Sequence, residues 1–366
     1  MAFGEIVCGS PGSGKSTYCY GKHQLFTALQ RPIAIVNLDP ANENIPYPCA
    51  INIADLITVE DAMDEHHLGP NGGMLYCMEY LEANIDWLEG KLAELQKDVY
   101  VVFDLPGQVE VSTNHLSVKR IVEKLGKAGL RLAAVHMCDA HYVTDAAKYI
   151  SVLLLSLRTM LHLELPHVNV LSKVDLITKY GELAFNLDFY TQVQDLSYLS
   201  EHLEASLPPQ FAALNMAIVS LVEDFGLVGF ETLAVEDKHS MLHLMRAVDR
   251  ASGCIFVPPP DAPRPPDALP MNPSESTAHA PNAYALMTSA LAPIRGPMSD
   301  PRDVQERWVD ARDAYEAHEK MKWRQEGEAV RELARKYTKE SEAGQRKNQA
   351  DGRNHVGSDF KIQERM

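Results

Sequence analysis

Short apolar runs alternate along this chain with longer stretches in which apolar residues recur at helical spacing. Such runs, bounded by turn residues, are typical of buried strands, and the helical stretches between them are typical of crossover helices. The pattern predicts an α/β fold, a mostly parallel sheet with helices on both faces, in which ligands bind at the carboxyl ends of the strands. Residues Leu75–Leu95 are expected to form one long helix. The predicted strands are Phe3–Cys8, Ile33–Leu38, Val99–Phe103, Leu132–Cys138, His167–Leu171 and Leu227–Phe230.

Composition divides the chain into three parts. Residues 1–257 carry the alternating pattern and predict one large domain. Proline is frequent in residues 258–301, which predicts a flexible or extended linker, because proline lacks the backbone N–H that regular ladders need. Residues 302–366 are highly charged and predict a separable tail, partly helical and partly disordered. The aromatic residues expected to dock this tail, where it docks at all, are Trp308, Tyr315 and Trp323.

Charge and cysteine usage exclude several classes of protein. The formal net charge of −16 argues against a general nucleic-acid binder and against binding to anionic membranes. The six cysteines show no CxxC spacing, so neither a zinc site nor a disulfide framework is predicted. The most apolar stretch, Ile150–Leu171, contains Arg158, Glu164 and Pro166, which a membrane span tolerates poorly. With no signal-like pattern at the N-terminus, we expect a soluble cytoplasmic protein.

A phosphate-binding P-loop, GSPGSGKS, follows the first predicted strand at Gly9 to Ser16. Its glycines permit backbone angles that point successive amides inward, and the N-terminus of the following helix favours an anion. Lys15 is expected to reach the outer phosphates, and the Ser16 hydroxyl is expected to ligate Mg²⁺. The predicted nucleotide-binding residues of this loop are Gly12, Ser13, Gly14, Lys15, Ser16 and Thr17.

Polar residues also follow the second and third predicted strands. In DLPGQVE, Asp104 occupies the place of a Walker B carboxylate that holds Mg²⁺ through water, and Gly107 permits an amide to approach the terminal phosphate. Gln108 and Glu110 are candidates to orient or polarise an attacking water. In NLDPA, Asp39 is expected beside the same site, where it would contact water, Mg²⁺ or an approaching loop.

The choice of base is predicted from SKVD, which follows the fifth predicted strand. The Asp175 carboxylate would accept two hydrogen bonds from guanine, whereas adenine would leave it unpaired at a cost of about 1–3 kcal/mol. Lys173 would lay its stem along the purine. Ser172 stands where such motifs usually have asparagine, and is expected to weaken the anchoring of this loop. The segment Gly229–Leu233 is expected to add a backbone contact to the base.

The order of these motifs resembles one known family. The segment LGPNGG lies just before the predicted long helix, and GSPGSGKS, NLDPAN, DLPGQVE and SKVD surround it in the order found in the GPN-loop GTPases. The signature of that family is matched by Gly69, Pro70 and Asn71, and the resemblance extends from Met1 to about Phe256. It implies a P-loop NTPase fold of the SRP and MinD branch that binds and hydrolyses GTP with Mg²⁺.

The resemblance also implies roles and partners. The protein would form a homodimer, or a heterodimer with another GPN-loop GTPase, in which Asn71 reaches the terminal or released phosphate in the neighbour's site. Asp39, Gln108 and Glu110 would position the lytic water. The family acts in the assembly and nuclear import of RNA polymerase, which implies polymerase subunits or assembly factors as partners and shuttling from cytoplasm to nucleus.

Two other functions are compatible with a P-loop. A nucleotide or small-molecule kinase would need a lid with arginines, and the residues from Tyr180 to Phe225 contain none. A scaffold that binds GTP without hydrolysing it would not need Asp39, Gln108 and Glu110. Measured turnover distinguishes these alternatives from a GTPase.

Overall fold

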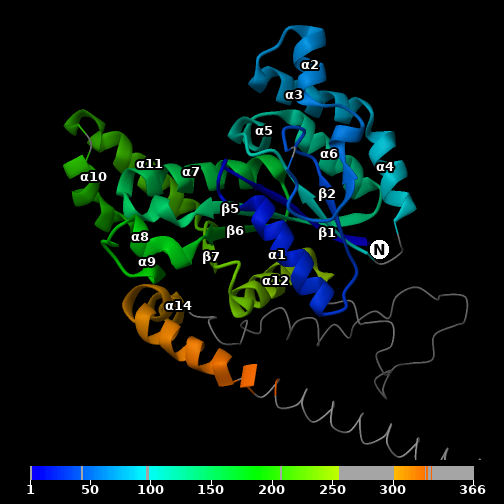
Figure 1. Ribbon diagram of the computed structural model, residues 1–366. Coiled ribbons are helices and arrows are strands. Elements are labelled where there is room, and N and C mark those ends of the chain that lie inside the picture. The colour runs from blue at the N-terminus through cyan, green and yellow to red at the C-terminus, as the bar shows by residue number, and fades with distance from the viewer. Residues whose placement is uncertain are drawn as a thin grey trace, which may run out of the picture. The chain divides into compact units, whose positions relative to one another are not determined.

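The computed structural model describes residues 2–42, 44–95, 99–206, 208–254 and 301–325, with residues 327, 328 and 331. In these residues the chain forms a seven-stranded parallel sheet with the strand order β3-β2-β4-β1-β5-β6-β7 (Figure 1). The predicted α/β class is therefore confirmed. The strands are β1 (Ala2–Gly9), β2 (Ile33–Asn37), β3 (Cys49–Asn52), β4 (Tyr100–Asp104), β5 (Leu130–Asp139), β6 (His167–Ser172) and β7 (Phe230–Leu233).

Helices cover both faces of the sheet. The described helices are α1 (Lys15–Ala28), α2 (Val59–His66), α3 (Pro70–Ala83), α4 (Ile85–Glu94), α5 (Val109–Thr113), α6 (Leu116–Lys127), α7 (Ala146–Leu163), α8 (Ile177–Tyr180), α9 (Leu187–Gln192), α10 (Ser200–Ser206), α11 (Ala212–Phe225), α12 (Lys238–Ser252) and α14 (Pro301–Gln305), with short turns η1 (Ile53–Asp55), η2 (Ala140–Thr144), η3 (Val174–Leu176), η4 (Leu196–Leu199), η5 (Pro209–Phe211) and η7 (Glu306–Asp310). Successive strand residues point to opposite faces. Val7 therefore packs in one buried cluster with α1 and α12, while its neighbour Ile6 packs in another with α3 and α6.

The carboxyl ends of the central strands meet at one edge of the sheet. Asn37 at the end of β2 pairs with Asp104 at the end of β4. Asp139 at the end of β5 likewise pairs with Ser172 at the end of β6. Because every strand pair is parallel, the loops that carry the predicted site residues emerge together at this edge.

The prediction of one long helix over Leu75–Leu95 is wrong. Helix α3 begins earlier, at Pro70, and ends at Ala83, and α4 begins at Ile85. The break lies at Asn84, whose backbone has φ −108° and ψ 36°. Its backbone N–H still donates to the Tyr80 carbonyl at 3.0 Å, and its side-chain amide donates to the same carbonyl at 2.8 Å, so the side chain adds a second donor where the helix ends.

Two strands also differ from the sequence prediction. Strand β3 was not predicted, because its four residues form a partly exposed edge with only Ile51 buried. Strand β7 begins at Phe230, where the predicted strand Leu227–Phe230 ends. Leu227 is exposed, so its apolar character does not mark a buried position here.

The compact unit of the domain extends to Val309 rather than ending near residue 257. Residues 255–300, which include the predicted linker up to residue 300, lie outside the described residues. Val304, which was assigned to the tail, is only 3% exposed and belongs to a buried cluster that includes Leu187. Trp308 is partly buried against the same cluster. A tail separable at residue 257 does not agree with this packing, because removing it would uncover these apolar contacts.

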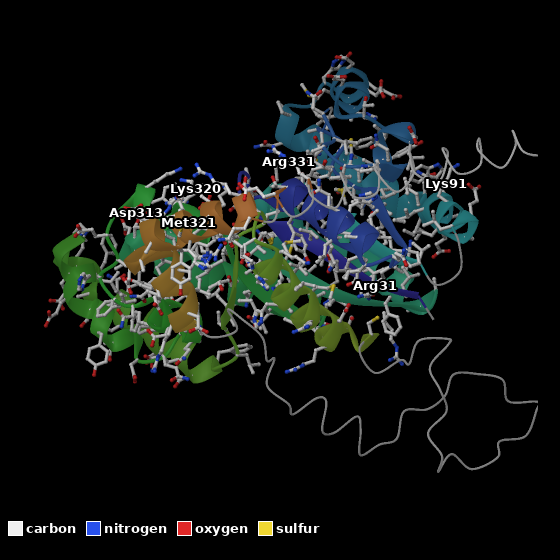
Figure 2. The ribbon with its side chains drawn as sticks, turned by 60° about the horizontal axis from the view of Figure 1, so that its bottom comes forward. Arg31, Lys91, Asp313, Lys320, Met321 and Arg331 are labelled. Carbon is white, nitrogen blue, oxygen red and sulfur yellow. The ribbon has the colours of Figure 1, made fainter. Side chains whose placement is uncertain are left out.

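The second unit, Asp310–Met366, is described in part. Its residues 312–325 are helical, with Arg312 donating to the Glu316 carboxylate at 3.0 Å one turn later. Figure 2 labels Lys320 and Met321 on this helix. Met321 and Trp323 are exposed, so this part of the helix is solvated, as expected of a surface helix.

Helix α7 is the one described helix that is long and apolar enough to cross a membrane by length and composition. Half of this helix is buried inside the domain. Leu153 and Leu157 pack there in the cluster that also contains strand residue Leu171. The helix therefore has the burial expected of a core helix.

Candidate nucleotide-binding site

The P-loop connects β1 to α1 with the backbone geometry that its glycines predict. Gly12 and Gly14 have φ values of 76° and 90°, in the left-handed region that disfavours other residues. Lys15 is buried, and its ammonium group donates to the carbonyls of Gly9 and Ser10, both at 3.2 Å. Burial lowers the pKa of Lys15, and the charges of nearby carboxylates oppose this shift. The loop thus holds its cation close to the main chain.

Asp104 and Ser16, the two residues predicted to hold Mg²⁺, lie side by side. The Ser16 hydroxyl donates to Oδ2 of Asp104 at 2.8 Å, and the Tyr47 hydroxyl donates to the same oxygen at 2.8 Å. Asp104 is 1% exposed, and its Oδ1 atom is buried without a hydrogen-bond partner. Burial raises the pKa of Asp104, while the two hydroxyl donors lower it. A buried carboxylate oxygen beside a serine hydroxyl is the donor set that Mg²⁺ takes in P-loop proteins, so these residues fit the ion.

Asp39 lies on the adjacent turn. The buried Asn37 side chain fixes this turn, because its amide donates to the Asp39 carbonyl at 3.0 Å and its oxygen accepts from the Asp39 amide at 3.2 Å. The Asp39 carboxylate accepts from the Ala41 amide at 3.0 Å. Burial raises the pKa of Asp39, and Lys15 opposes the shift. Among the described residues no three His, Cys, Asp or Glu side chains form a metal site by themselves.

The loop after β4 contacts the P-loop through Gly107. A Cβ atom at Gly107 would lie 3.0 Å from the Lys15 ammonium nitrogen and 3.3 Å from the Pro11 Cα atom, so only glycine fits without displacement. Gln108 follows, and Glu110 is exposed in the first turn of α5. The structure therefore brings this loop to the phosphate end of the site.

The Gly69-Pro70-Asn71 signature forms the start of α3. Pro70 occupies the first position of the helix, where a missing N–H costs nothing and the fixed φ is favourable. Asn71 is exposed, and its Oδ1 atom accepts from Nε2 of Gln108 in the same chain at 3.0 Å. Figure 1 shows α2 and α3 beside each other at the top of the view. Two catalytic candidates far apart in sequence are thus adjacent.

The SKVD segment is joined to the P-loop by two side chains. Lys173, in the left-handed conformation at φ 61°, donates to the Gly12 carbonyl and to the Asp139 carboxylate, each at 2.6 Å. The Ser172 hydroxyl contacts the Ser13 carbonyl at 2.7 Å and the Cys138 carbonyl at 3.1 Å. Serine therefore anchors the loop despite the expected weakening. Asp175, the residue predicted to recognise the base, is half-buried in η3, beside this anchored segment.

The remaining predictions have mixed outcomes. Thr17 is exposed in the first turn of α1. Gly229 precedes β7 and accepts from Asn169 at 3.3 Å. The rest of the predicted segment Gly229–Leu233 is β7, whose last residue Leu233 pairs with Ser172, and its backbone contact to the base stays a prediction. Sequence reasoning missed Tyr47 and Asp139. Asp139 has a sequence signal, an acidic residue at a strand end, but Tyr47 has none.

Comparison with known proteins decides the family. A family profile described as "Conserved hypothetical ATP binding protein" matches residues 7–254. The chain is 58% identical over 257 residues to GPN-loop GTPase 2 of Danio rerio, covering 70% of this chain and 82% of that protein. This protein is a GPN-loop GTPase. This GPN-loop GTPase is also 56% identical over 258 residues to GPN-loop GTPase QQT1 of Arabidopsis thaliana, covering 70% and 87%.

Two further likenesses extend the comparison. GPN-loop GTPase 2 of Saccharomyces cerevisiae is 42% identical over 329 residues, covering 88% of each chain. The crystal structure of a GTPase from Pyrococcus abyssi in apo form matches with a TM-score of 0.55 at 24% identity, covering 67% of this GPN-loop GTPase and 96% of that chain. At that identity the structural likeness supports the fold.

Proposed function

We propose that this GPN-loop GTPase cleaves the terminal phosphate of GTP by in-line attack of water, with Mg²⁺ bound at Ser16 and Asp104. The observation that carries this proposal is the buried Asp104 carboxylate, which faces Ser16 with one oxygen and has no partner for the other. The ion would neutralise charge on the phosphate oxygens when bound. Lys15 and the loop amides would stabilise the charge that develops on the transferred group. Replacing Ser16 with alanine should weaken Mg²⁺-dependent GTP binding, and unchanged magnesium dependence would remove Ser16 from the metal site.

We assign the positioning of the attacking water to Asp39, Gln108 and Glu110. Asp39 lies on a turn fixed by Asn37, and burial raises its pKa, which improves it as a proton acceptor. Gln108 is fixed through Asn71. Glu110 begins a short helix at the same edge.

We propose that the preferred base is guanine. The family profile is described by ATP binding, whereas the related proteins are named GTPases. The support from this chain is the anchored Lys173 and the adjacent Asp175, which would pair with guanine and repel adenine. Titration with labelled GDP and ADP tests the assignment, and Asp175→Asn should erode the preference. Equal affinity of the native protein for GDP and ADP would refute it.

We further propose that the active form is a dimer in which Asn71 acts on the neighbour's nucleotide. In the structure described here Asn71 bonds to Gln108 of its own chain, so the proposed action requires this bond to open or to serve the neighbouring site. Asn71→Ala and Asp39→Ala should each lower turnover while leaving nucleotide binding largely intact, because most phosphate contacts come from the P-loop.

Mixing these two variants distinguishes action in one chain from action across the dimer. A mixed dimer has one whole site if Asn71 acts on the neighbour, so turnover should recover towards half the native value per dimer. Differential affinity tags confirm that mixed dimers have formed. If Asn71 acts within its own chain, both sites of every mixed dimer are damaged and turnover stays at the level of the single variants.

The cellular role that we propose is assembly or nuclear import of RNA polymerase, with a cytoplasmic protein that shuttles to the nucleus. Support for this role comes from family resemblance alone. Proteins that copurify with the GTP-bound form, compared with the GDP-bound form, test it. Recovery of no polymerase subunit or assembly factor in either state would contradict the role while leaving the GTPase activity intact.

A further inference from the structure

The segment Pro301–Val309 packs on the side of the domain that carries Ser172–Asp175, which we call the base-recognition segment. Helix α14 lies beside α9, as Figure 1 shows. Val304 is 3% exposed, which is unusual in a region of otherwise charged composition. Forty-six residues separate Cys254 from Pro301, so the contact is a long-range one.

Gln305 makes the most specific contacts of this segment. Its Oε1 atom accepts from the Leu187 backbone amide at 2.6 Å, and its Nε2 atom donates to Oδ1 of Asn186 at 3.1 Å. The two ends of one amide are therefore matched to a donor and an acceptor at the start of α9. The Arg302 pair with Asp188 is longer, at 3.8 Å, and its guanidinium is 81% exposed, so it contributes little.

The surface that receives Val304 is continuous with the core beneath the base-recognition segment. Val174 and Ile177, on either side of Asp175, belong to the same buried cluster as Leu187 and Val304. Helix α9 is also bonded to α7, because the Tyr149 hydroxyl donates to the Tyr190 carbonyl at 2.8 Å. Only the α8 turn and the short connection after it separate Asp175 from Leu187 along the chain.

We infer that Val304 and Gln305 are positioning residues for guanine nucleotide binding: they hold α9, and through the shared core they hold η3 with Asp175. This inference rests on the proposed role of Asp175 in base recognition. Undocking the segment should let η3 sample conformations in which Asp175 does not meet the base. Nucleotide affinity would then fall, because only a fraction of molecules would be competent to bind. The P-loop and the metal residues lie outside this cluster, so the turnover number should hold.

The test uses the full chain and four variants. Gln305→Ala removes both amide bonds with little change in packing, and Val304→Asp places a charge in the apolar cluster. Glu306→Ala is the matched control, because Glu306 is an exposed residue of the same segment. Hydrogen exchange at the Leu187 amide reports docking without any nucleotide, and Val304→Ile is the conservative variant that should preserve it.

Gln305→Ala should speed exchange at the Leu187 amide about tenfold. It should also raise KM for GTP and the rate of GDP release severalfold, with kcat unchanged, while Glu306→Ala leaves all four values at the native level. Unchanged Leu187 exchange would overturn the docking. Faster exchange with native KM and GDP release would overturn the positioning role, as would a fall in kcat alone. If the native protein shows no preference for guanine nucleotides, the base assignment fails and the positioning role fails with it, whereas Leu187 exchange still decides whether the segment is docked.

Discussion

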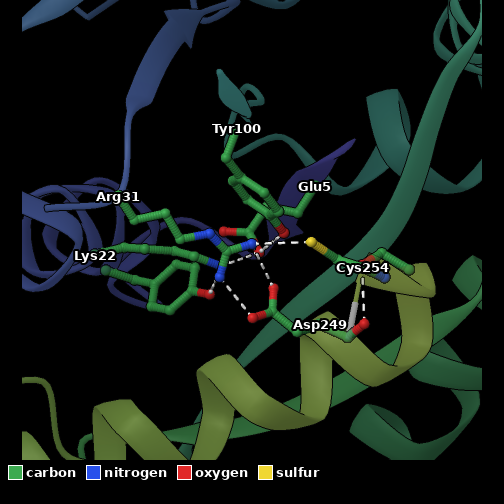
Figure 3. A network of polar contacts seen from close by, with 8 residues as sticks. Glu5, Lys22, Arg31, Tyr100, Asp249 and Cys254 are labelled. Atoms are coloured by element: carbon green, nitrogen blue, oxygen red, sulfur yellow. Dashed lines mark hydrogen bonds and ion pairs between the residues drawn. The ribbon is translucent and has the colours of Figure 1, made fainter. Parts of the chain in front are cut away.

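A buried ion pair joins the two elements that carry the P-loop. Lys22 of α1 pairs with Glu5 of β1, and the two side chains are 1% and 0% exposed (Figure 3). The Tyr100 hydroxyl donates to the Glu5 carboxylate at 3.2 Å, and the Lys22 ammonium donates to the Tyr18 hydroxyl at 3.2 Å. Water does not reach either charge, and each has few other partners. The stability of each buried charge therefore depends on the presence of the other.

The replacement Lys22→Met tests this dependence. It keeps the volume of the side chain but leaves the Glu5 carboxylate without its counter-charge. Removing one partner of a buried pair costs about 3–5 kcal/mol, far above the ~0–1 kcal/mol typical of a surface pair. Glu5→Gln alone should cost a similar amount, because it leaves the ammonium unpaired. The double variant has no buried charge, so it should be more stable than the sum of the two losses predicts, by about 2 kcal/mol or more.

Urea unfolding of the full chain, followed by far-UV circular dichroism, measures these free energies. Lys91→Met is the control, because Lys91 forms an exposed pair with Glu94 at 3.6 Å and is labelled in Figure 2. The control should change stability by less than ~0.5 kcal/mol. Single variants that cost no more than the control, or losses that simply add in the double variant, would refute the reasoning.

Three further predictions concern the site and the core. Ser172→Ala should weaken GDP binding about tenfold, since the Ser13 carbonyl loses a buried donor, and an unchanged dissociation constant would contradict this. Gly107→Ala should lower turnover about tenfold by displacing Lys15, and native single-turnover rates would exclude the clash. Burial lowers the pKa of His136 to about 4, from the ordinary value of 6.5 that the unfolded chain keeps. As the pH falls, the unfolded chain therefore takes up the proton first. This contribution to stability is full above pH 6.5 and falls towards pH 4 by up to ~1.4 kcal/mol per pH unit. His136→Gln should therefore make the urea unfolding midpoint depend less on pH between these two values.

The sequence was sufficient for features that depend on local pattern. The strand followed by GSPGSGKS fixes both the fold class and the position of the phosphate end, because glycine positions and strand ends have few alternative geometries. Asp104 and Ser16 were predicted from two separate motifs, and the structure places them 2.8 Å apart. Their roles with GTP and Mg²⁺ stay predictions until binding is measured.

Features that depend on long-range packing were not accessible from pattern alone. Tyr47 lies in a loop without periodicity, yet it donates to Asp104 from 57 residues away. The break at Asn84 depends on one residue with non-helical backbone angles, whose side chain adds a second donor to the Tyr80 carbonyl. Val304 lies in a charged segment, where a single apolar residue gives no signal of burial. In each case the deciding partner is distant in sequence or is a single contact.

The bridge formed by Lys173 bears on how a ligand is held. One ammonium group touches the loop assigned to phosphate and the strand end next to the segment assigned to the base, so neither can shift without disturbing the other. A ligand fragment that occupies only one end meets the ordering cost of binding, its lost translational and rotational freedom, for half of the contacts. The intact nucleotide meets that ordering cost once and gains contacts at both ends. Its affinity is therefore expected to exceed the product of the fragment affinities, and the protein should discriminate against nucleosides and free phosphates by this coupling alone.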